Sequence, residues 1–193
     1  MAIIKKFNGF EAKYQAVGEG YEPLPVGAYV AKILQVKSEE KSDGRQMIIM
    51  CVDVAEGEHK DFFNKRFTAD KQNNIQPLKW KGVYRLNVPI DNDDAWKTRN
   101  FCSAIGAIED SNNGYRWNWD DQTLVGKFVG INVREREWEW ENKSGVTTEI
   151  GALVPAQDVR DGKVTPMKIK KIQKKDETAT TTTTSTITDE LPF

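Results

Sequence analysis

The sequence predicts a mainly β domain with one helix, followed by a flexible tail. Segments in which apolar and polar residues alternate, as on the two faces of a strand, outnumber segments with helical spacing. The one helical pattern lies at about 93–108, and the longest alternating segment follows it at 124–140. A chain of 193 residues suffices for one folded domain with appendages.

The composition narrows the class of protein. Hydrophobic residues make up 38% of the chain and charged residues 30%, which is typical of a polar chain with one core. No apolar stretch approaches the ~20 residues that span a bilayer, and the first ten residues lack the apolar region of a secretory signal. With Cys51, Cys102 and His59 as the only cysteines and histidine, neither a disulfide framework nor a Cys/His zinc site is available. We therefore expect a cytoplasmic protein without membrane association or cofactor.

The charge is distributed unevenly along the chain. The formal net charge is −1, but four acidic residues and no basic residue follow position 175. Residues 1–175 thus hold 28 basic and 25 acidic residues, a net charge of +3. An acidic tail on a mildly basic body is compatible with a nucleic-acid partner.

Composition also divides the chain into three regions. Residues 1–24 show no clear period and are expected to form an N-terminal arm or edge strand. Residues 25–172 carry the strand and helix patterns of the folded domain. Residues 173–193 form a flexible linker, almost entirely threonine between Thr178 and Thr188, that ends in an acidic tip.

The first half of the domain predicts a hairpin and a third strand. Pro25 and Gly27 open a strand at Ala28–Val36, and the turn signal Ser42-Asp43-Gly44 leads to a second strand at Gln46–Ala55. The second strand is apolar on both faces, which indicates a central position.

Two weaker strand patterns follow this hairpin. Asp61–Phe67, rich in phenylalanine, is expected to form a short strand, and Tyr84–Ile90 a strand or an irregular segment limited by Pro89.

The second half predicts a helix and a long hairpin. Asp93 and Asp94 are suited to cap a helix, whose apolar face repeats to Ile108 and which ends at Asn112-Asn113-Gly114. Strands are expected at Leu124–Trp140, Val146–Val154 and Met167–Ile172, with the hairpin turn at Lys143-Ser144-Gly145. A partly open five-stranded barrel, the OB-fold among others, fits this order, with the long hairpin as an arm.

The long hairpin provides the first candidate binding surface. Strand alternation places four residues of one strand on the same side: Arg134, Arg136, Trp138 and Trp140. Guanidinium groups neutralise phosphates and indole rings stack on bases, whereas the glutamates at 135, 137, 139 and 141 on the other side would repel DNA. The alternative is that the tryptophans pack on the body of the domain.

Basic and aromatic residues also interleave in a second candidate surface: Phe62, Phe63, Lys65, Arg66 and Phe67, with Trp80, Lys81, Tyr84 and Arg85. In a short strand Phe63 and Phe67 would share one face with Lys65. The alternative, that most of these phenylalanines are core residues, is stronger here. The run from Lys163 to Lys175 has no acidic residue after Lys163 and would extend a phosphate-binding track.

The sequence contains no catalytic motif, so we expect a non-enzymatic protein. It has no GxxxxGK phosphate loop, and its single histidine, His59, is expected in a solvated loop beside Gly57. Asp91, Asp93 and Asp94 could hold a metal ion but are better explained as a loop and a helix cap, and no metal site is predicted.

The end of the chain carries a family resemblance. The sequence Asp189-Glu190-Leu191-Pro192-Phe193 after a low-complexity linker resembles the partner-binding tip of bacterial single-stranded DNA-binding proteins. The segments at 24–29 (LPVGAY) and 124–127 (LVGK) are similar to phage-encoded single-stranded DNA-binding proteins of replication and recombination modules. This resemblance, over about residues 22–172, implies an OB-fold and sequence-independent single-strand binding.

Three hypotheses of different class follow. The first is a phage-type single-stranded DNA-binding protein in the bacterial host's cytoplasm, which recruits replication or repair enzymes through its tip. The second is a phage adaptor or structural protein that binds protein rather than DNA. The third is a metal-dependent nuclease built on the acidic residues. The oligomeric state, with a homo-oligomer among the alternatives, stays open.

Overall fold

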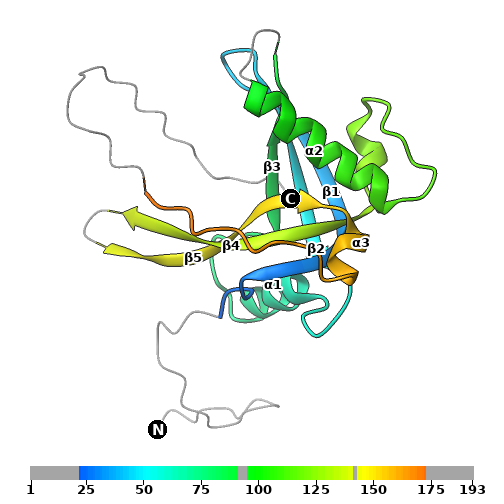
Figure 1. The fold of residues 1–193 in the computed structure, drawn as a ribbon. Helices are drawn as coiled ribbons and strands as arrows, with labels where there is room; N and C mark the ends of the chain where they lie inside the picture. Colours follow the sequence, from blue (N-terminus) through cyan, green and yellow to red (C-terminus); the bar gives the residue numbers. More distant parts are fainter. Residues whose placement is uncertain (1–21, 91–94, 141–142, 173–193) are drawn as a thin grey trace, which may run out of the picture.

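The structure, a computed structural model, describes residues 22–90, 95–140 and 143–172. Within these residues it contains one five-stranded antiparallel sheet in the order β3-β2-β1-β4-β5, with three α-helices. The mainly β class predicted from the sequence is confirmed. In Figure 1, α2 lies above β4 and β5 and α1 below them, and the β4–β5 hairpin extends beyond the rest of the sheet.

The first hairpin forms as predicted. β1 (Gly27–Glu40) and β2 (Gln46–Val54) pair antiparallel from Ala31↔Val54 to Glu40↔Gln46, and a bulge interrupts the register between Ile33 and Gln35. The last seven residues of β2 are all buried, since the strand lies between β1 and β3 with both faces covered. β2 is therefore an inner strand, as its apolar run indicated.

The predicted strand at Asp61–Phe67 is wrong, because this segment begins helix α1 (Phe62–Gln72). The side chain of Asp53, buried in β2, accepts hydrogen bonds from the backbone N–H groups of Phe63 and Asn64 at 2.9 and 3.1 Å. A carboxylate thus caps the helix from eight residues before its N-cap residue, Asp61, whose side chain makes no cap bond. Phe63 and Phe67, four residues apart, lie on one side of a helix as well as of a strand, so their spacing did not distinguish the two.

β3 (Val83–Asn87) and α2 (Ala95–Ser111) confirm the predicted strand and helix at these places. The proposed capping residues Asp93 and Asp94, and Asp91, lie outside the described residues. Asn112 ends the helix: its Nδ2 donates to the carbonyls of Ile108 (2.7 Å) and Phe128 (2.8 Å), and its Oδ1 accepts from the Phe128 N–H at 3.0 Å. This one side chain fastens α2 to the start of the next strand.

The long hairpin is confirmed with different ends. Its strands are β4 (Phe128–Trp140) and β5 (Lys143–Val154). The part of the predicted strand before Phe128 is instead a 3-10 helix, η1 (Asp121–Leu124), and a turn, because Leu124 enters the core with no exposed surface.

The predicted turn at Lys143-Ser144-Gly145 is wrong, since Lys143 and Gly145 are paired with Trp140 and Trp138 in the ladder. The ladder pairs Trp140 directly with Lys143, and residues 141–142 lie outside the described residues.

After helix α3 (Ala156–Arg160), the predicted last strand at Met167–Ile172 does not form. Lys170 alone makes a parallel bridge to Arg136: its N–H donates to the Glu135 carbonyl at 2.8 Å, and its carbonyl accepts from the Glu137 N–H at 3.0 Å. β1 pairs with β4 only as far as Val133, so this bridge uses the β4 edge that β1 leaves open. Figure 1 shows the segment running along the arm.

The core lies between the sheet and α2. Apolar residues of the strands, with Leu24 and Leu124, pack there against one face of the helix. The largest fully buried side chains of this core are Ile33, Met50, Leu86, Ile108, Leu124 and Ile131. None of the helices in the described ranges is long and apolar enough to cross a membrane.

Candidate nucleic-acid interface

A groove of about 760 Å³ lies between the two edge strands of the sheet, β3 and β5. β3 contributes Tyr84, Arg85 and Asn87, β4 contributes Arg134 and Arg136, and β5 lines the other side from Thr148 to Ala152. The structure thus brings together two surfaces that are separate in the sequence: the basic face of the long hairpin and the segment around Trp80.

Positive charge dominates this groove. Its cationic lining residues are Lys79, Lys81, Arg85, Arg134, Arg136 and Lys170, and its acidic lining residue is Glu149. Lys81 and Arg85 are exposed. Lys170 belongs to the basic run that was expected to extend a phosphate-binding track, whereas Lys79 is a groove residue that no predicted surface included.

Glu149 is the counter-charge of three of these cations. Its Oε1 accepts from Arg134 Nη2 at 2.8 Å and Nε at 3.0 Å, and lies 3.4 Å from Lys170 Nζ; its Oε2 lies 3.4 Å from Arg136 Nη1. Burial acts to raise the pKa of Glu149, but the hydrogen bond from Arg134 and the charge of Lys170 outweigh it and lower the pKa below its usual value. Glu149 is therefore ionised at neutral pH, and one carboxylate faces three cations.

Two tryptophans line the groove. Trp80 is half-buried: its Nε1 donates to the carbonyls of Val52 (3.1 Å) and Gly82 (3.2 Å), and Phe67 packs against it at 5.6 Å between ring centroids. Trp96, in the first turn of α2, is 71% exposed. Sequence reasoning does not identify Trp96, although its place off the apolar stripe of the helix is a usable signal.

Tyr84 is a core residue at the bottom of the groove. It is buried, and its hydroxyl shares a hydrogen bond with Asn100 of α2. Burial raises the pKa of the Tyr84 hydroxyl, with the Asn100 bond and the charge of Arg134 acting in the opposite direction. Tyr84 therefore supports the groove wall as a neutral phenol.

The predicted binding residues that belong to α1 do not line the groove. Phe63 is buried in the core, so it packs against the sheet, and Lys65 donates from its Nζ to the Lys60 carbonyl at 2.8 Å. Arg66 and Phe67 also belong to α1, and Phe67 reaches the groove only indirectly, by supporting Trp80. The alternative that these phenylalanines are core residues is confirmed for Phe63.

The two tryptophans of the arm lie beyond the groove. Trp138 packs across the ladder on Gly145: a Cβ placed there would approach its Nε1 to 3.0 Å. Trp140 is 72% exposed. Arg136 lines both the groove and an adjoining cavity of about 400 Å³ beside Lys170 and Lys171, so basic residues connect the groove to the arm.

The remaining predicted sites are the C-terminal tip, the candidate metal ligands and the loop of His59. The tip residues Asp189, Glu190, Leu191, Pro192 and Phe193 lie outside the described residues. Among the residues that the structure does describe, no group of three or more His, Cys, Asp and Glu side chains is placed to hold a metal ion. His59 packs edge-on against Tyr29, with 5.5 Å between ring centroids. Neither the protein-family models nor the curated proteins include a match to this chain.

Proposed function

We propose that the chain is a non-catalytic, sequence-independent single-stranded DNA-binding protein of phage replication or recombination. The observation that carries this proposal is the groove between β3 and β5, where six cations face one carboxylate beside the indoles of Trp80 and Trp96. Lysine and arginine neutralise phosphates and release the counterions condensed on them, which favours binding at low salt, and indoles stack on bases of any sequence.

The aromatic residues favour a single strand over a duplex. A duplex presents only base edges in its grooves, because the base faces are stacked on one another. The exposed faces of Trp96 and, on the arm, Trp140 are suited to bases that are already unstacked. We place the strand along the groove, past Arg136, and onto the same side of the arm.

We further infer that the domain is an OB-fold. The edge strands β3 and β5 line one groove, which supports a sheet curled toward a barrel that stays partly open. Helix α2 lies between β3 and β4 in the chain, so the order of three strands, a helix and a long hairpin agrees with the order for which this fold was expected. In this fold the strand faces and the loop between the last two strands contact nucleic acid.

The tip completes the proposal from the sequence alone. Asp189 and Glu190 carry two negative charges next to the apolar residues Leu191 and Phe193 in the sequence. A partner pocket with a basic rim and an apolar floor would match both features, and recognition of acidic motifs by basic clusters is a general mode. We assign to the tip the recruitment of replication or repair enzymes.

Fluorescence anisotropy with labelled oligo-dT tests the proposed function. We expect saturable binding that exceeds binding to a duplex of equal length and falls as salt rises, with intact oligonucleotide after incubation with magnesium. Preference for the duplex would contradict the proposal. No binding by folded protein would also contradict it and would favour the adaptor protein. Degradation of the oligonucleotide would favour the nuclease.

A further inference from the structure

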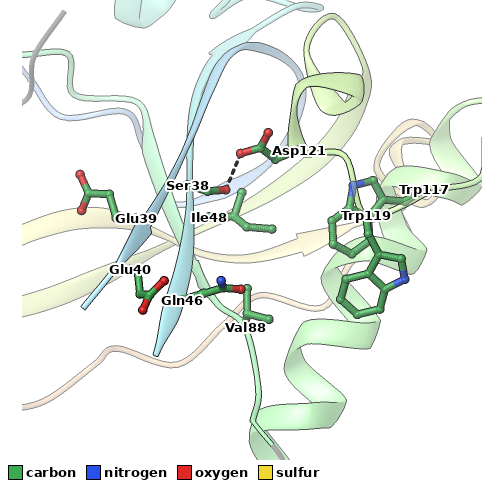
Figure 2. A pocket seen from close by; sticks show the side chains of 9 residues that line it. All are labelled: Ser38, Glu39, Glu40, Gln46, Ile48, Val88, Trp117, Trp119 and Asp121. Carbon is green, nitrogen blue, oxygen red and sulfur yellow. Dashed lines mark hydrogen bonds between the residues drawn. The ribbon is translucent and has the colours of Figure 1, made fainter. Parts of the chain in front are cut away.

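A second pocket, of about 390 Å³, shares no lining residue with the groove and has the opposite charge. It is formed by the end of β1, the start of β2, Val88 and the loop between α2 and η1. Its charged lining residues are all acidic: Glu39, Glu40 and Asp121. In the view of Figure 2, Trp117 and Trp119 line one side, the two glutamates lie on the other, and Asp121 lies between them.

The two tryptophans form an aromatic wall that is open to solvent. Their ring centroids are 4.7 Å apart, and Phe101 of α2 stacks on Trp119 at 6.1 Å and 22°. Trp117 is anchored, since its Nε1 donates to the Asp120 carbonyl at 3.1 Å. Trp119 is 73% exposed, so the packing on Phe101 and Trp117 leaves most of its ring uncovered.

The carboxylates retain capacity for a further donor. Asp121 accepts a hydrogen bond from the Ser38 hydroxyl on Oδ2 and another from Gln122 Nε2 on Oδ1 at 3.1 Å. A carboxylate accepts about four hydrogen bonds, so each oxygen can accept one more. Glu39 shares its charge with Lys37, whose Nζ lies 3.0 Å away, whereas the pocket wall itself contributes no cation.

These features exclude the DNA strand and favour a cation. Three carboxylates would repel phosphates, so Trp119 does not continue the path of the strand. A guanidinium group is planar, stacks on indole faces, and donates to carboxylates in a fork geometry. An ammonium group matches the charge but not the planar shape.

We propose that this pocket binds an arginine side chain of a basic peptide segment in a partner protein. The guanidinium group stacks on Trp119 and donates to Asp121, and Glu39 and Glu40 attract the flanking basic residues. The site is a protein-docking surface separate from the DNA groove, and it does not depend on the proposed DNA binding.

The test is an NMR titration of the DNA-free full chain with the acetylated, amidated peptide Gly-Arg-Gly. The indole N–H signals of Trp117 and Trp119 are assigned with the Trp117→Phe and Trp119→Phe variants. We expect both signals to shift with the arginine peptide, and to shift far less with a citrulline peptide, which keeps the shape of the side chain but not its charge. Trp140, equally exposed but distant in the fold, serves as the internal control.

Two variants locate the contacts. Asp121→Asn keeps the acceptor for Ser38 but removes the charge, and Trp119→Ala removes the stacking surface; each should weaken peptide binding about tenfold, as loss of one partly desolvated charged contact predicts. Circular dichroism confirms that each variant is folded. Equal shifts with the citrulline peptide, shifts at Trp140 alone, or no shift at all would overturn the proposal. Shifts of these signals with oligo-dT, and not with the arginine peptide, would assign the pocket to the DNA path and overturn the proposal. The effect of groove variants on oligo-dT binding tests the proposed function separately, because the groove shares no lining residue with this pocket.

Discussion

Arg134 and Glu149 face each other across the β4–β5 ladder, with Arg134 Nη2 2.8 Å and Nε 3.0 Å from the same carboxylate oxygen. Arg136 and Lys170 share this carboxylate. Glu149 therefore holds the basic side chains of the groove in place, and it also cancels part of the charge that would attract a phosphate.

Replacing Glu149 should increase DNA affinity. In Glu149→Gln the groove loses its acidic lining residue, so Arg134, Arg136 and Lys170 become available to phosphates. One additional phosphate contact would steepen the log–log dependence of affinity on salt by about 0.7 for a single strand. Anisotropy with oligo-dT measures both effects. Glu139→Gln, on the other face of β4, is the matched control, and weaker binding of Glu149→Gln would show that holding the arginines matters more than their charge.

The same residue predicts a pH dependence of stability. The pKa of Glu149 is lowered in the folded protein, so the folded state binds its proton less readily than the unfolded state. The stabilisation is present above the usual glutamate pKa of 4.5 and is lost as the pH falls through the lower, folded value. Thermal melts should show wild type more stable than Glu149→Gln at neutral pH, with the difference vanishing in acid. A difference that stays constant with pH would contradict the ion-pair account.

Comparing Trp96 in the basic groove with Trp119 in the acidic pocket distinguishes base stacking from a general effect of removing an exposed indole. Trp96→Ala should weaken oligo-dT binding by about 1–3 kcal/mol, the usual cost of losing one base-stacking ring. Its melting temperature should change little, because the ring is 71% exposed. Trp119→Ala, with a ring 73% exposed in the acidic pocket, should retain wild-type DNA affinity. Equal losses in the two variants would contradict the placement of the strand.

Asp53 should stabilise the fold through helix α1. Its carboxylate accepts from the N–H groups of Val54, Phe63 and Asn64. Asp53→Ala leaves these donors unsatisfied and should lower the free energy of unfolding by roughly 1–3 kcal/mol, as measured by urea denaturation. Asp61→Gly, at the N-cap position without a cap bond, is the control and should cost much less, because glycine fits the left-handed backbone there (φ 60°). The opposite order would mean that α1 is capped locally.

Periodicity was sufficient to predict the strands with long alternating or continuous apolar runs. It failed where contacts between residues distant in the sequence determine the secondary structure. Helix α1 is capped by Asp53 of β2 and not by Asp61 at its own N-cap position, so the contact that fixes its start is distant in the sequence. The strand predicted at Met167–Ile172 has only the short β4 edge beyond Val133 to pair with, and Lys170 alone uses it.

In the candidate site, too, local patterns predicted which residues share a strand face but not which strands come together. Alternation correctly placed Arg134 and Arg136 on one side of the hairpin, and both contact Glu149. Their proximity to Trp80 and Arg85 depends on how the two edges of the sheet approach each other, which no local pattern encodes. Trp96 joins them only because α2 crosses the same end of the groove.

The central claim is that the groove between β3 and β5 binds the backbone of a single strand. The most direct measurement is the salt dependence of oligo-dT affinity for wild type, Lys81→Ala, Arg136→Ala and Lys65→Ala. Lys81 and Arg136 line the groove, whereas Lys65 lies on α1 and bonds to the Lys60 carbonyl. We predict that each of the first two variants reduces the steepness of the log–log slope by about 0.7, one phosphate contact, and that Lys65→Ala leaves it unchanged. A slope that is unchanged in both groove variants, or reduced in Lys65→Ala alone, would contradict the claim.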